Sequence, residues 1–256
     1  MSNKLFDLTG RIALVTGSSK GIGFSIAEGL AEAGATVILN SRNGKELEAA
    51  RERISAKTGA TVRDVTFDVT DPAAVEDAVD QIESTFGPIG ILFNNAGIQR
   101  RLALTDFDLA GWREVMAGNL DSVFIVGQTV ARRMIPRGRG KIVNTCSLTS
   151  EVARPTIAPY TASKGAVKML TKAMCVEWAP FGIQVNGIGP GYFKTELNKA
   201  LVDNPEFDAW VTKRTPAGRW GEVDELKGVA IFLASGASNF VNGQVIYVDG
   251  GLLSGM

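Results

Sequence analysis

Residues 11–23 read RIALVTGSSKGIG, and this stretch decides the fold. Residues 12–15 form a short apolar run of the kind that becomes a strand buried on both faces. Glycines follow at positions 17, 21 and 23, where a segment of helical period begins. Glycines at a strand-to-helix junction let the backbone turn tightly and approach a phosphate group, whose charge the amides at the helix N-terminus favour. The stretch therefore predicts the first strand, turn and helix of a sheet that binds a dinucleotide.

The same alternation of strands and helices continues along the chain. Together with 11–16, strands buried on both faces are expected at 36–40, 62–67, 89–93, 141–144, 184–188 and 244–248. Helices are expected at 22–33, 45–57, 73–86, 112–134, 162–178 and 223–234. This order predicts an α/β fold of the Rossmann type, a three-layer doubly wound parallel sheet of about seven strands with helices on both faces. No linker, repeat or low-complexity tract interrupts it, so we expect a single domain over residues 1–256.

The longest stretch without a predicted strand runs from 192 to 224 and contains Pro205, Pro216 and several charges. It follows the strand at 184–188. Ligands of open parallel sheets bind beside the loops at the carboxyl ends of the strands. We therefore expect residues 192–224 to be a loop that forms a substrate lid.

The composition argues against several classes of protein. Lys plus Arg and Asp plus Glu number 27 each, so no net field attracts nucleic acid or a membrane surface, and neither is expected as a partner. Two cysteines without any histidine form neither a disulfide framework nor a common zinc site, so no metal is expected. The chain shows no signal-peptide pattern and no apolar run of about 18 residues, and we expect a cytoplasmic protein.

Three further motifs accompany the glycine turn, which reads Thr-Gly-x-x-x-Gly-x-Gly. Asp68-Val69 closes the third predicted strand, Asn94-Asn95-Ala96-Gly97 follows the fourth, and Pro190-Gly191-Tyr192-Phe193-Lys194-Thr195 follows the sixth. In type and order these motifs resemble the classical short-chain dehydrogenase/reductase family, over the whole chain. The resemblance implies a nicotinamide dinucleotide bound by residues of these motifs, namely Gly17, Ser19, Lys20, Gly21, Ile22, Gly23, Asp68, Val69, Asn95, Ala96, Gly97, Pro190, Gly191, Phe193 and Thr195.

The end of the second predicted strand favours NADP over NAD. An NAD site usually has an acid there, which binds the ribose 2′-hydroxyl. Here the sequence is Asn40-Ser41-Arg42. Arg42 can bind a 2′-phosphate, Ser41 can donate a hydroxyl group, and Lys20 in the glycine turn adds a second positive charge. We expect NADP as the cofactor; the alternative is that Arg42 and Lys20 are ordinary surface charges.

Acid/base chemistry near neutral pH must come from side chains other than histidine. Tyr160 and Lys164 are four residues apart on a predicted helix and share a face, and Ser147 follows the preceding strand. A neighbouring ammonium group and an oxidised nicotinamide should both lower the pKa of Tyr160 from its usual value of about 10. The family resemblance adds Asn119, which in the family interrupts the long helix and supports a water that conducts protons. It also implies a catalytic tetrad of Asn119, Ser147, Tyr160 and Lys164, with Tyr160 and Lys164 contacting the cofactor.

Three stretches resemble one group within this family, the gluconate 5-dehydrogenases, which interconvert D-gluconate and 5-keto-D-gluconate. They are residues 94–101, 147–160 and 214–221. A polyol with a carboxylate needs a cation and several polar partners. We expect Gln99, Arg100 and Arg101 to bind this substrate together with Ser147 and Tyr160, and one of the two arginines to hold the carboxylate. The further candidates are Arg154, Glu151, Tyr192 and Trp220, although any of the arginines could be a surface charge and Arg101 or Arg154 could pair with Glu151.

Other functions stay open at this point. A 3-oxoacyl-carrier-protein reductase would share the fold, the tetrad and the NADP preference, and would use Arg132, Arg133, Arg137 and Arg139 to bind an acidic carrier protein. Another NADP-dependent ketone or polyol reductase fits the same motifs. A non-catalytic NADP-binding protein would need a damaged tetrad, and the tetrad is complete. The family resemblance also implies a homotetramer, formed through the helices of Asn119 and Tyr160 and through the last strand.

Overall fold

The strands form one parallel sheet whose order reverses near its centre. The computed structural model describes residues 4–255, apart from the side chain of Leu197. Within them the strands are β1 (Ile12–Val15), β2 (Thr36–Ser41), β3 (Val62–Thr66), β4 (Ile89–Asn94), β5 (Gly140–Thr145), β6 (Ile183–Pro190) and β7 (Val245–Val248). Their spatial order is β3-β2-β1-β4-β5-β6-β7. The reversal lies between β1 and β4, and such a switch point is where an open parallel sheet binds its ligand.

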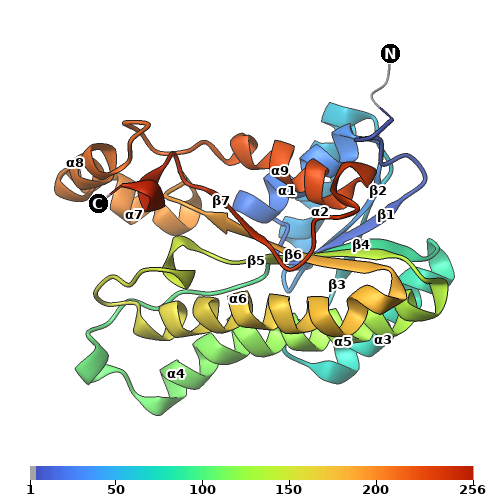
Figure 1. Ribbon diagram of the computed structural model, residues 1–256, viewed down its shortest axis with the longest axis horizontal. Coiled ribbons are helices and arrows are strands. Elements are labelled where there is room, and N and C mark those ends of the chain that lie inside the picture. The colour runs from blue at the N-terminus through green and yellow to red at the C-terminus, as the bar shows by residue number, and fades with distance from the viewer. Residues whose placement is uncertain (1–3, 256) are drawn as a thin grey trace.

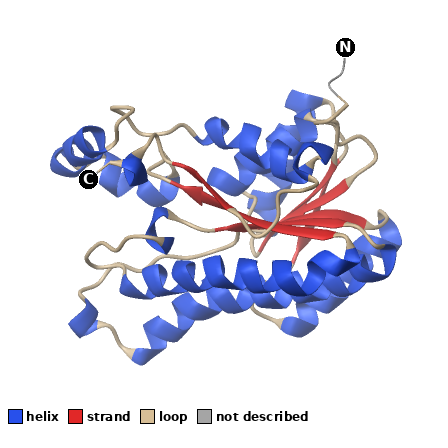
Figure 2. Ribbon diagram, in the orientation of Figure 1, coloured by secondary structure: helices blue, strands red, loops and turns tan. Residues whose placement is uncertain are grey.

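Helices cover both faces of this sheet, as Figures 1 and 2 show. They are α1 (Gly21–Glu32), α2 (Gly44–Thr58), α3 (Pro72–Thr85), α4 (Leu109–Met116), α5 (Ser122–Met134), α6 (Ala158–Trp178), α7 (Lys199–Val202), α8 (Pro205–Arg214) and α9 (Lys227–Ala234). α1, α2 and α9 pack on one face and bury Ile26 and Leu233. α3, α5 and α6 pack on the other face and bury Val79 and Val167. No helix within residues 4–255 is long and apolar enough to cross a membrane.

The side chains of the central strands alternate between these two cores. In β1, Val15 packs under α1, while Leu14 packs on the side of α5. The prediction that every strand is buried on both faces is wrong for the two edge strands. In β3 Val62 and Val65 are buried but Arg63 is exposed, and every residue of β7 is only partly buried. One face of each edge strand is less well covered, which gives β3 its partly alternating pattern.

The predicted helix at 112–134 is longer and less regular than expected. It begins at Leu109 as α4 and ends at Met134 as α5, and residues Ala117–Asp121 between them form a π turn. A π turn contains one residue more than the α-helical turn it replaces. The remaining predicted boundaries differ from the observed ones by a few residues, and a 3-10 turn at Val223–Leu226 leads into α9.

Residues 192–224 contain two helices, α7 and α8, instead of a loop alone. Figure 1 shows both on the left, beyond the carboxyl ends of β5 and β6. Asn204 caps α8 by accepting a hydrogen bond from the amide of Phe207, and Pro205 occupies the first turn. These are ordinary signals of a helix start.

Candidate active site

The glycine turn packs against the loop that follows β4. Gly17 and Gly21 have φ values of 62° and 61°, in the left-handed region that favours glycine. A Cβ atom at Gly17 would lie 2.7 Å from Cα of Ala96, and one at Gly23 would lie 2.3 Å from the carbonyl oxygen of Gly17. Asn95 holds the turn in place, because its Nδ2 atom donates to the carbonyl of Gly17 at 3.0 Å. The close packing therefore requires glycine at 17 and 23.

The beginning of α1 is open beside this turn. Lys20 is the N-cap residue, and its side chain forms no hydrogen bond to the first amides of the helix. A Cβ atom at Gly21 would meet no other atom within 4 Å, so the backbone here can be approached. Helix N-termini without a side-chain cap offer several amides to an anion. Residues 19–23 therefore fit a pyrophosphate group.

Two cations lie at the carboxyl ends of β1 and β2. Arg42 follows Ser41, the last residue of β2, and its Nη1 atom is 3.8 Å from Oδ2 of Asp68. Lys20 is 3.6 Å from Glu46. The two basic side chains are 73% and 64% exposed, so these ion pairs are weak and an incoming phosphate can replace them.

The end of β3 carries the other predicted cofactor residues. Asp68 accepts hydrogen bonds from the amide and the hydroxyl of Thr70 at 2.9 and 2.7 Å. Burial opposes ionisation of Asp68, but these bonds and the charge of Arg42 together lower its pKa. Val69 packs against the core beside α3. Asp68 is therefore an ionised turn residue beside the Arg42 guanidinium.

Ser147, Tyr160 and Lys164 come together where β5 ends and α6 begins. The Ser147 hydroxyl accepts from the amide of Thr149 at 3.2 Å and lies close enough to the Tyr160 phenol to lower its pKa. The Nζ atom of Lys164 lies over the Tyr160 ring, 5.7 Å from its centroid. It donates to the carbonyl oxygen of Thr145 at 2.6 Å. Ser147 and Tyr160 line a pocket, and Lys164, 3% exposed, lies behind them.

Burial dominates the ionisation of this cluster. It lowers the pKa of Lys164 to about 8, and it raises the pKa of Tyr160 by more than the nearby Ser147 hydroxyl lowers it. It also raises the pKa of the Cys146 thiol to about 11, so Cys146 is no thiolate nucleophile at neutral pH. The expectation that Lys164 lowers the pKa of Tyr160 is wrong for the protein alone, because burial raises this pKa and the ammonium group is directed to the Thr145 carbonyl. The effect of an oxidised nicotinamide stays a prediction.

Asn119 is fully buried in the π turn and joins the loop after β4 to α6. Its Oδ1 atom accepts from the amide of Ile98 at 2.7 Å, and its Nδ2 atom donates to the Ile98 carbonyl at 2.9 Å and to Oγ of Ser163 at 3.2 Å. A Cβ atom at Gly97 would lie 2.9 Å from Oδ1 of Asn119. Asn119 thus fixes this loop; its role in proton transfer stays a prediction.

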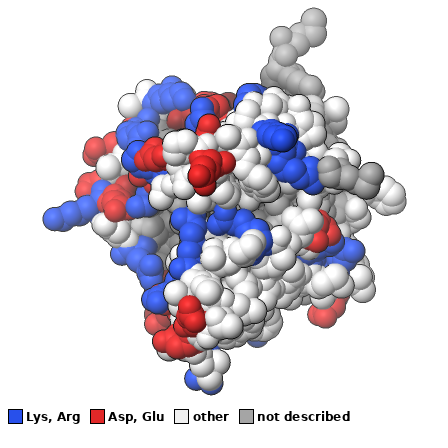
Figure 3. Space-filling view, turned by 90° about the vertical axis from the view of Figure 1, so that its left-hand side faces the viewer, with Lys and Arg blue, Asp and Glu red and all other residues white. Residues whose placement is uncertain are grey.

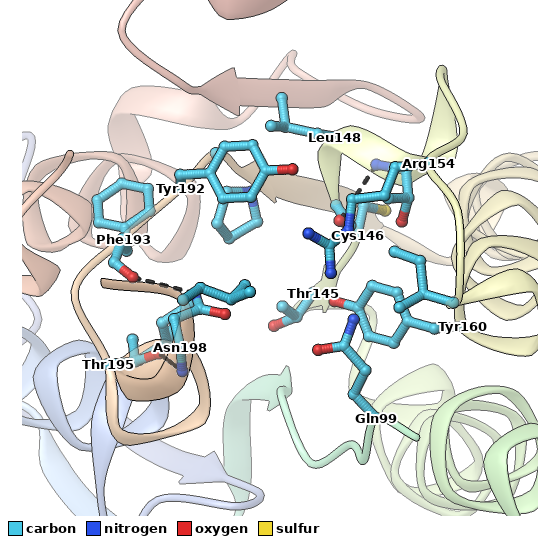
Figure 4. Close-up of a pocket in the computed structure, with 17 residues that line it drawn as sticks. Gln99, Thr145, Cys146, Leu148, Arg154, Tyr160, Tyr192, Phe193, Thr195 and Asn198 are labelled. Carbon is cyan, nitrogen blue, oxygen red and sulfur yellow. Dashed lines mark hydrogen bonds between the residues drawn. The ribbon is translucent and has the colours of Figure 1, made fainter. Parts of the chain in front are cut away.

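The pocket beside Ser147 and Tyr160 receives side chains from two sides (Figure 4). Gln99 and Arg154 point into it from the side of Tyr160, and Tyr192 and Asn198 from the opposite side. The motif after β6 contributes Pro190, Gly191, Phe193 and Thr195 to the same lining. On the face that carries α7 and α8, basic side chains gather across the middle, between two groups of acidic ones (Figure 3).

An aromatic cluster joins this pocket to residues 192–224. The Tyr192 ring makes edge contacts with Phe207, Trp210 and Trp220 at centroid distances of 5.5, 5.8 and 5.6 Å. The Arg154 guanidinium lies 5.0 Å from the centroid of Phe207, and its charge acts to lower the pKa of Tyr192. Arg154 therefore connects the loop after β5 to α8.

The two consecutive arginines contact different neighbours. Arg100 forms an ion pair with Glu114 of α4, and neither Arg100 nor Arg101 is part of the pocket lining. Arg101 donates to Oε1 of Gln99 at 3.3 Å. Its pKa is lowered by burial and by the nearby positive charge of Arg154. The structure thus brings Arg101, rather than Arg100, together with Arg154.

Other residues were misplaced or missed by sequence reasoning. Glu151 lies outside the pocket lining, where it pairs with Lys168 at 2.5 Å and accepts from the Tyr247 hydroxyl. Thr149 and Asn198 line the pocket although no motif indicated them. Thr149 could have been found from its position two residues after Ser147, whereas Asn198 has no local signal.

Comparisons with known proteins agree with this geometry. A family model described as "Enoyl-(Acyl carrier protein) reductase" matches residues 17–253. Gluconate 5-dehydrogenase of Gluconobacter oxydans (strain 621H) is 58% identical over 248 residues, which are 97% of this chain and 96% of that protein. 5-keto-D-gluconate 5-reductase of Escherichia coli (strain K12) is 52% identical over 251 residues, 98% of each chain. This chain belongs to the short-chain dehydrogenase/reductase family.

A solved structure of this family superposes closely on the chain. It is a gluconate 5-dehydrogenase from Burkholderia cenocepacia J2315 in complex with NADP and tartrate, with a TM-score of 0.96, 57% identity and 99% of both chains covered. Membership of the short-chain dehydrogenase/reductase family makes the protein an oxidoreductase with a Rossmann-type sheet, as the motifs implied.

Proposed function

We propose that the protein is an NADP-dependent gluconate 5-dehydrogenase, which interconverts D-gluconate and 5-keto-D-gluconate by hydride transfer at carbon 5. The observation that carries this proposal is a single pocket lined by Ser147, Tyr160, Gln99 and Arg154. The two hydroxyl groups suit a reacting alcohol or ketone, and the guanidinium suits the carboxylate of a sugar acid. The gluconate enzymes described above are similar to this chain over nearly its whole length.

The cofactor would lie along the carboxyl ends of the strands, from the glycine turn to residues 190–195. The open amides at the start of α1 would hold its pyrophosphate, and Arg42, Ser41 and Lys20 would hold its 2′-phosphate. Bound NADPH would supply the hydride for reduction, and bound NADP⁺ would accept it in oxidation. The neighbour from Burkholderia cenocepacia was solved with NADP, which supports this choice.

Tyr160 would exchange the proton with the reacting oxygen. Ser147 would hydrogen-bond that oxygen and keep it close to the phenol. The raised pKa of Tyr160 keeps the phenol protonated at neutral pH, which is the form that ketone reduction requires. Lys164, whose pKa is about 8, can release or take up a proton in the same pH range. Asn119 would hold the loop beside this group.

The substrate carboxylate would bind near Arg154 and Arg101. Reaction at carbon 5 leaves the carboxylate four carbons away, so a cation at a distance from Ser147 can select the carbon that reacts. Arg154 lines the pocket, and Arg101 adds a second positive charge beside it. Arg100 is paired with Glu114 outside the lining and would contribute less.

A carrier-protein reductase is the weaker candidate. Its expected basic patch included Arg133 and Arg137. Arg133 forms ion pairs with Glu76 and Asp80, and Arg137 forms a two-bond ion pair with Glu83. These α3 carboxylates neutralise half of the patch, which argues against an acidic partner there.

The remaining expectations form part of the same proposal. Residues 192–224 would act as a lid within one domain of residues 1–256. The protein would be a cytoplasmic homotetramer. Phe124 on α5 and Met169 and Val176 on α6 are 47%, 60% and 76% exposed, and these apolar side chains suit a contact between subunits. Both cysteines are free thiols, which suits a reducing compartment.

Absorbance at 340 nm with purified protein tests the proposal. We expect oxidation of NADPH with 5-keto-D-gluconate and reduction of NADP⁺ with D-gluconate, both much faster than with NAD(H). Acetoacetyl thioester serves as the competing substrate. Efficient reduction of the thioester with no reaction of 5-keto-D-gluconate would replace the proposed function by that of a carrier-protein reductase.

A further inference from the structure

Thr156 adopts a backbone conformation that a threonine rarely takes. Its φ is 71°, and no other non-glycine residue within 4–255 has a positive φ. A β-branched residue in this region is strained, because its Cβ atom crowds the backbone. Pro155 precedes it, and a proline followed by a residue of positive φ is the pattern of a type II turn, which favours glycine at the second place. The sequence has threonine there instead.

The turn joins two parts of the pocket. Arg154, two residues before Thr156, lines the pocket, and so does Ile157, the residue after it. Ile157 is the N-cap of α6, and its carbonyl accepts from the amide of Thr161. The turn therefore sets how Arg154 is placed relative to the helix that carries Tyr160.

The turn also holds a third segment. The carbonyl oxygen of Thr156 accepts a hydrogen bond from the amide of Leu102 at 2.9 Å. Leu102 directly follows Arg101, and Gln99 is two residues further back. A residue with negative φ at 156 would redirect the flanking peptide groups and move this carbonyl away from Leu102. The strained turn thus links the Gln99–Arg101 segment to the Arg154 segment.

We propose that the left-handed turn at Thr156 is a positioning element that sets the selectivity of this site for acid substrates. It acts through the backbone, because the Thr156 side chain is exposed and lies outside the pocket lining. The turn keeps the guanidiniums of Arg101 and Arg154 near each other against their repulsion, so that a carboxylate can be bound by both. This inference rests on the proposed acid substrate. Strain that is kept by contacts on both sides is a recurring feature of functional sites.

Two substitutions at position 156 separate the effect of the backbone conformation from the effect of the threonine side chain. Thr156→Gly keeps the positive φ without strain, and Thr156→Pro excludes it, because the proline ring fixes φ near −65°. For Thr156→Pro we expect a rise of about tenfold in the KM for the sugar acid, with the KM for an uncharged ketone and the Kd for NADPH within about twofold of wild type. For Thr156→Gly we expect all three constants within about twofold.

A second pair of variants tests the hydrogen bond from the Leu102 amide to the Thr156 carbonyl and includes a control for misfolding. Leu102→Pro removes the amide that donates to Thr156 and should raise the acid KM as Thr156→Pro does. Ala103→Pro is its control, since Ala103 has a φ of −59° and its amide donates no hydrogen bond among those of the described residues. Hydrogen exchange at the Leu102 amide should be at least tenfold faster in Thr156→Pro than in wild type and unchanged in Thr156→Gly.

The outcomes distinguish this inference from the proposed function. If wild type reduces another sugar acid but not 5-keto-D-gluconate, the proposed function is wrong. A selective rise in the KM for that acid in Thr156→Pro would still support the positioning role of the turn. If 5-keto-D-gluconate is reduced and Thr156→Pro leaves its KM unchanged, or raises acid and ketone KM equally, the inference is wrong. If wild type accepts no acid, both fail.

Discussion

The ammonium group of Lys164 lies over the ring of Tyr160, 5.7 Å from its centroid, and donates to the Thr145 carbonyl. Burial favours the neutral form of both side chains, since it lowers the pKa of Lys164 and raises that of Tyr160. In the protein alone, the pair is therefore set for proton donation by the phenol. A positive charge brought by an oxidised nicotinamide would act in the opposite direction and favour the phenolate.

Tyr160→Phe should abolish nearly all turnover while the fold and NADPH binding persist. The substitution removes only the phenol oxygen, so the ring contact with Lys164 remains. We expect kcat to fall by at least about 10²-fold, the usual range for loss of an acid/base group. Steady-state kinetics and NADPH fluorescence titration measure the two effects. Retention of most of the activity would show that the proton follows another path.

Arg42→Ala should weaken NADP much more than NAD. A hydrogen bond between charged groups contributes about 1.5–3 kcal/mol, so NADP affinity should fall about tenfold or more. Arg63→Ala, which removes an exposed arginine from β3, is the control and should leave both affinities unchanged. An equal loss for NADP and NAD would contradict the assignment of Arg42 to the 2′-phosphate.

Arg154→Met and Arg101→Met should each raise the KM for 5-keto-D-gluconate by about tenfold or more, because a charge-assisted contact to the carboxylate is lost. Uncharged ketones should keep their KM with the Arg101 variant. Arg100→Met is the matched control, since Arg100 forms an ion pair with Glu114 of α4. A large effect in the control and none at Arg101 would reverse the assignment of the two arginines.

Lys141→Met should stabilise the fold near neutral pH without changing turnover. Lys141 is 4% exposed on β5 and donates only to the Ser238 hydroxyl at 3.2 Å among the described groups. Burial and the charge of Arg11 lower its pKa from 10.5 to about 8. Below pH 8 both the folded and unfolded chains carry the proton, so the full cost of burying the charge is present. As pH rises from 8 to 10.5 the folded chain loses the proton first and this cost disappears.

Urea unfolding at several pH values measures this difference. The gain in the free energy of unfolding should be on the order of 1–3 kcal/mol at pH 7 and should shrink toward pH 10. Lys213→Met, at an exposed lysine of α8, should give no such gain. A constant difference across this pH range would mean that the charge on Lys141 is not its source.

The sheet and the glycine turn could be predicted because their signals are local. An apolar run such as 12–15 and the glycines after it need no distant contact to be interpreted. The environments of Arg100, Arg101 and Glu151 could not be predicted in this way. The direction of a loop side chain is set by groups that are distant in the sequence. Glu114 sets the direction of Arg100, and Tyr247 that of Glu151. The predicted direction of the Tyr160 pKa shift was wrong for the same reason, since the burial of this side chain depends on the whole fold.

The two helices in 192–224 were missed for a different reason. The signals of α8 are present, because Asn204 is its cap and Pro205 lies in its first turn. The charges and prolines of the segment indicate a loop, whereas Phe207 and Trp210 of α8 pack on Tyr192. A helix that packs on a small aromatic cluster lacks the broad apolar stripe by which core helices are recognised.

The π turn at Ala117–Asp121 lies within the helical segment Leu109–Met134. It restricts the number of residues in this segment as well as their types. Removing one residue from the turn would restore regular α-helical winding and close the bulge, while α4 and α5 would keep nearly the same relative rotation. Asn119, which is fully buried in the turn, would then lose its contacts with Ile98 and Ser163. Single-residue deletions here should therefore be far less tolerated than substitutions at exposed positions of the same segment, and homologous chains should keep the same count of residues between Leu109 and Met134.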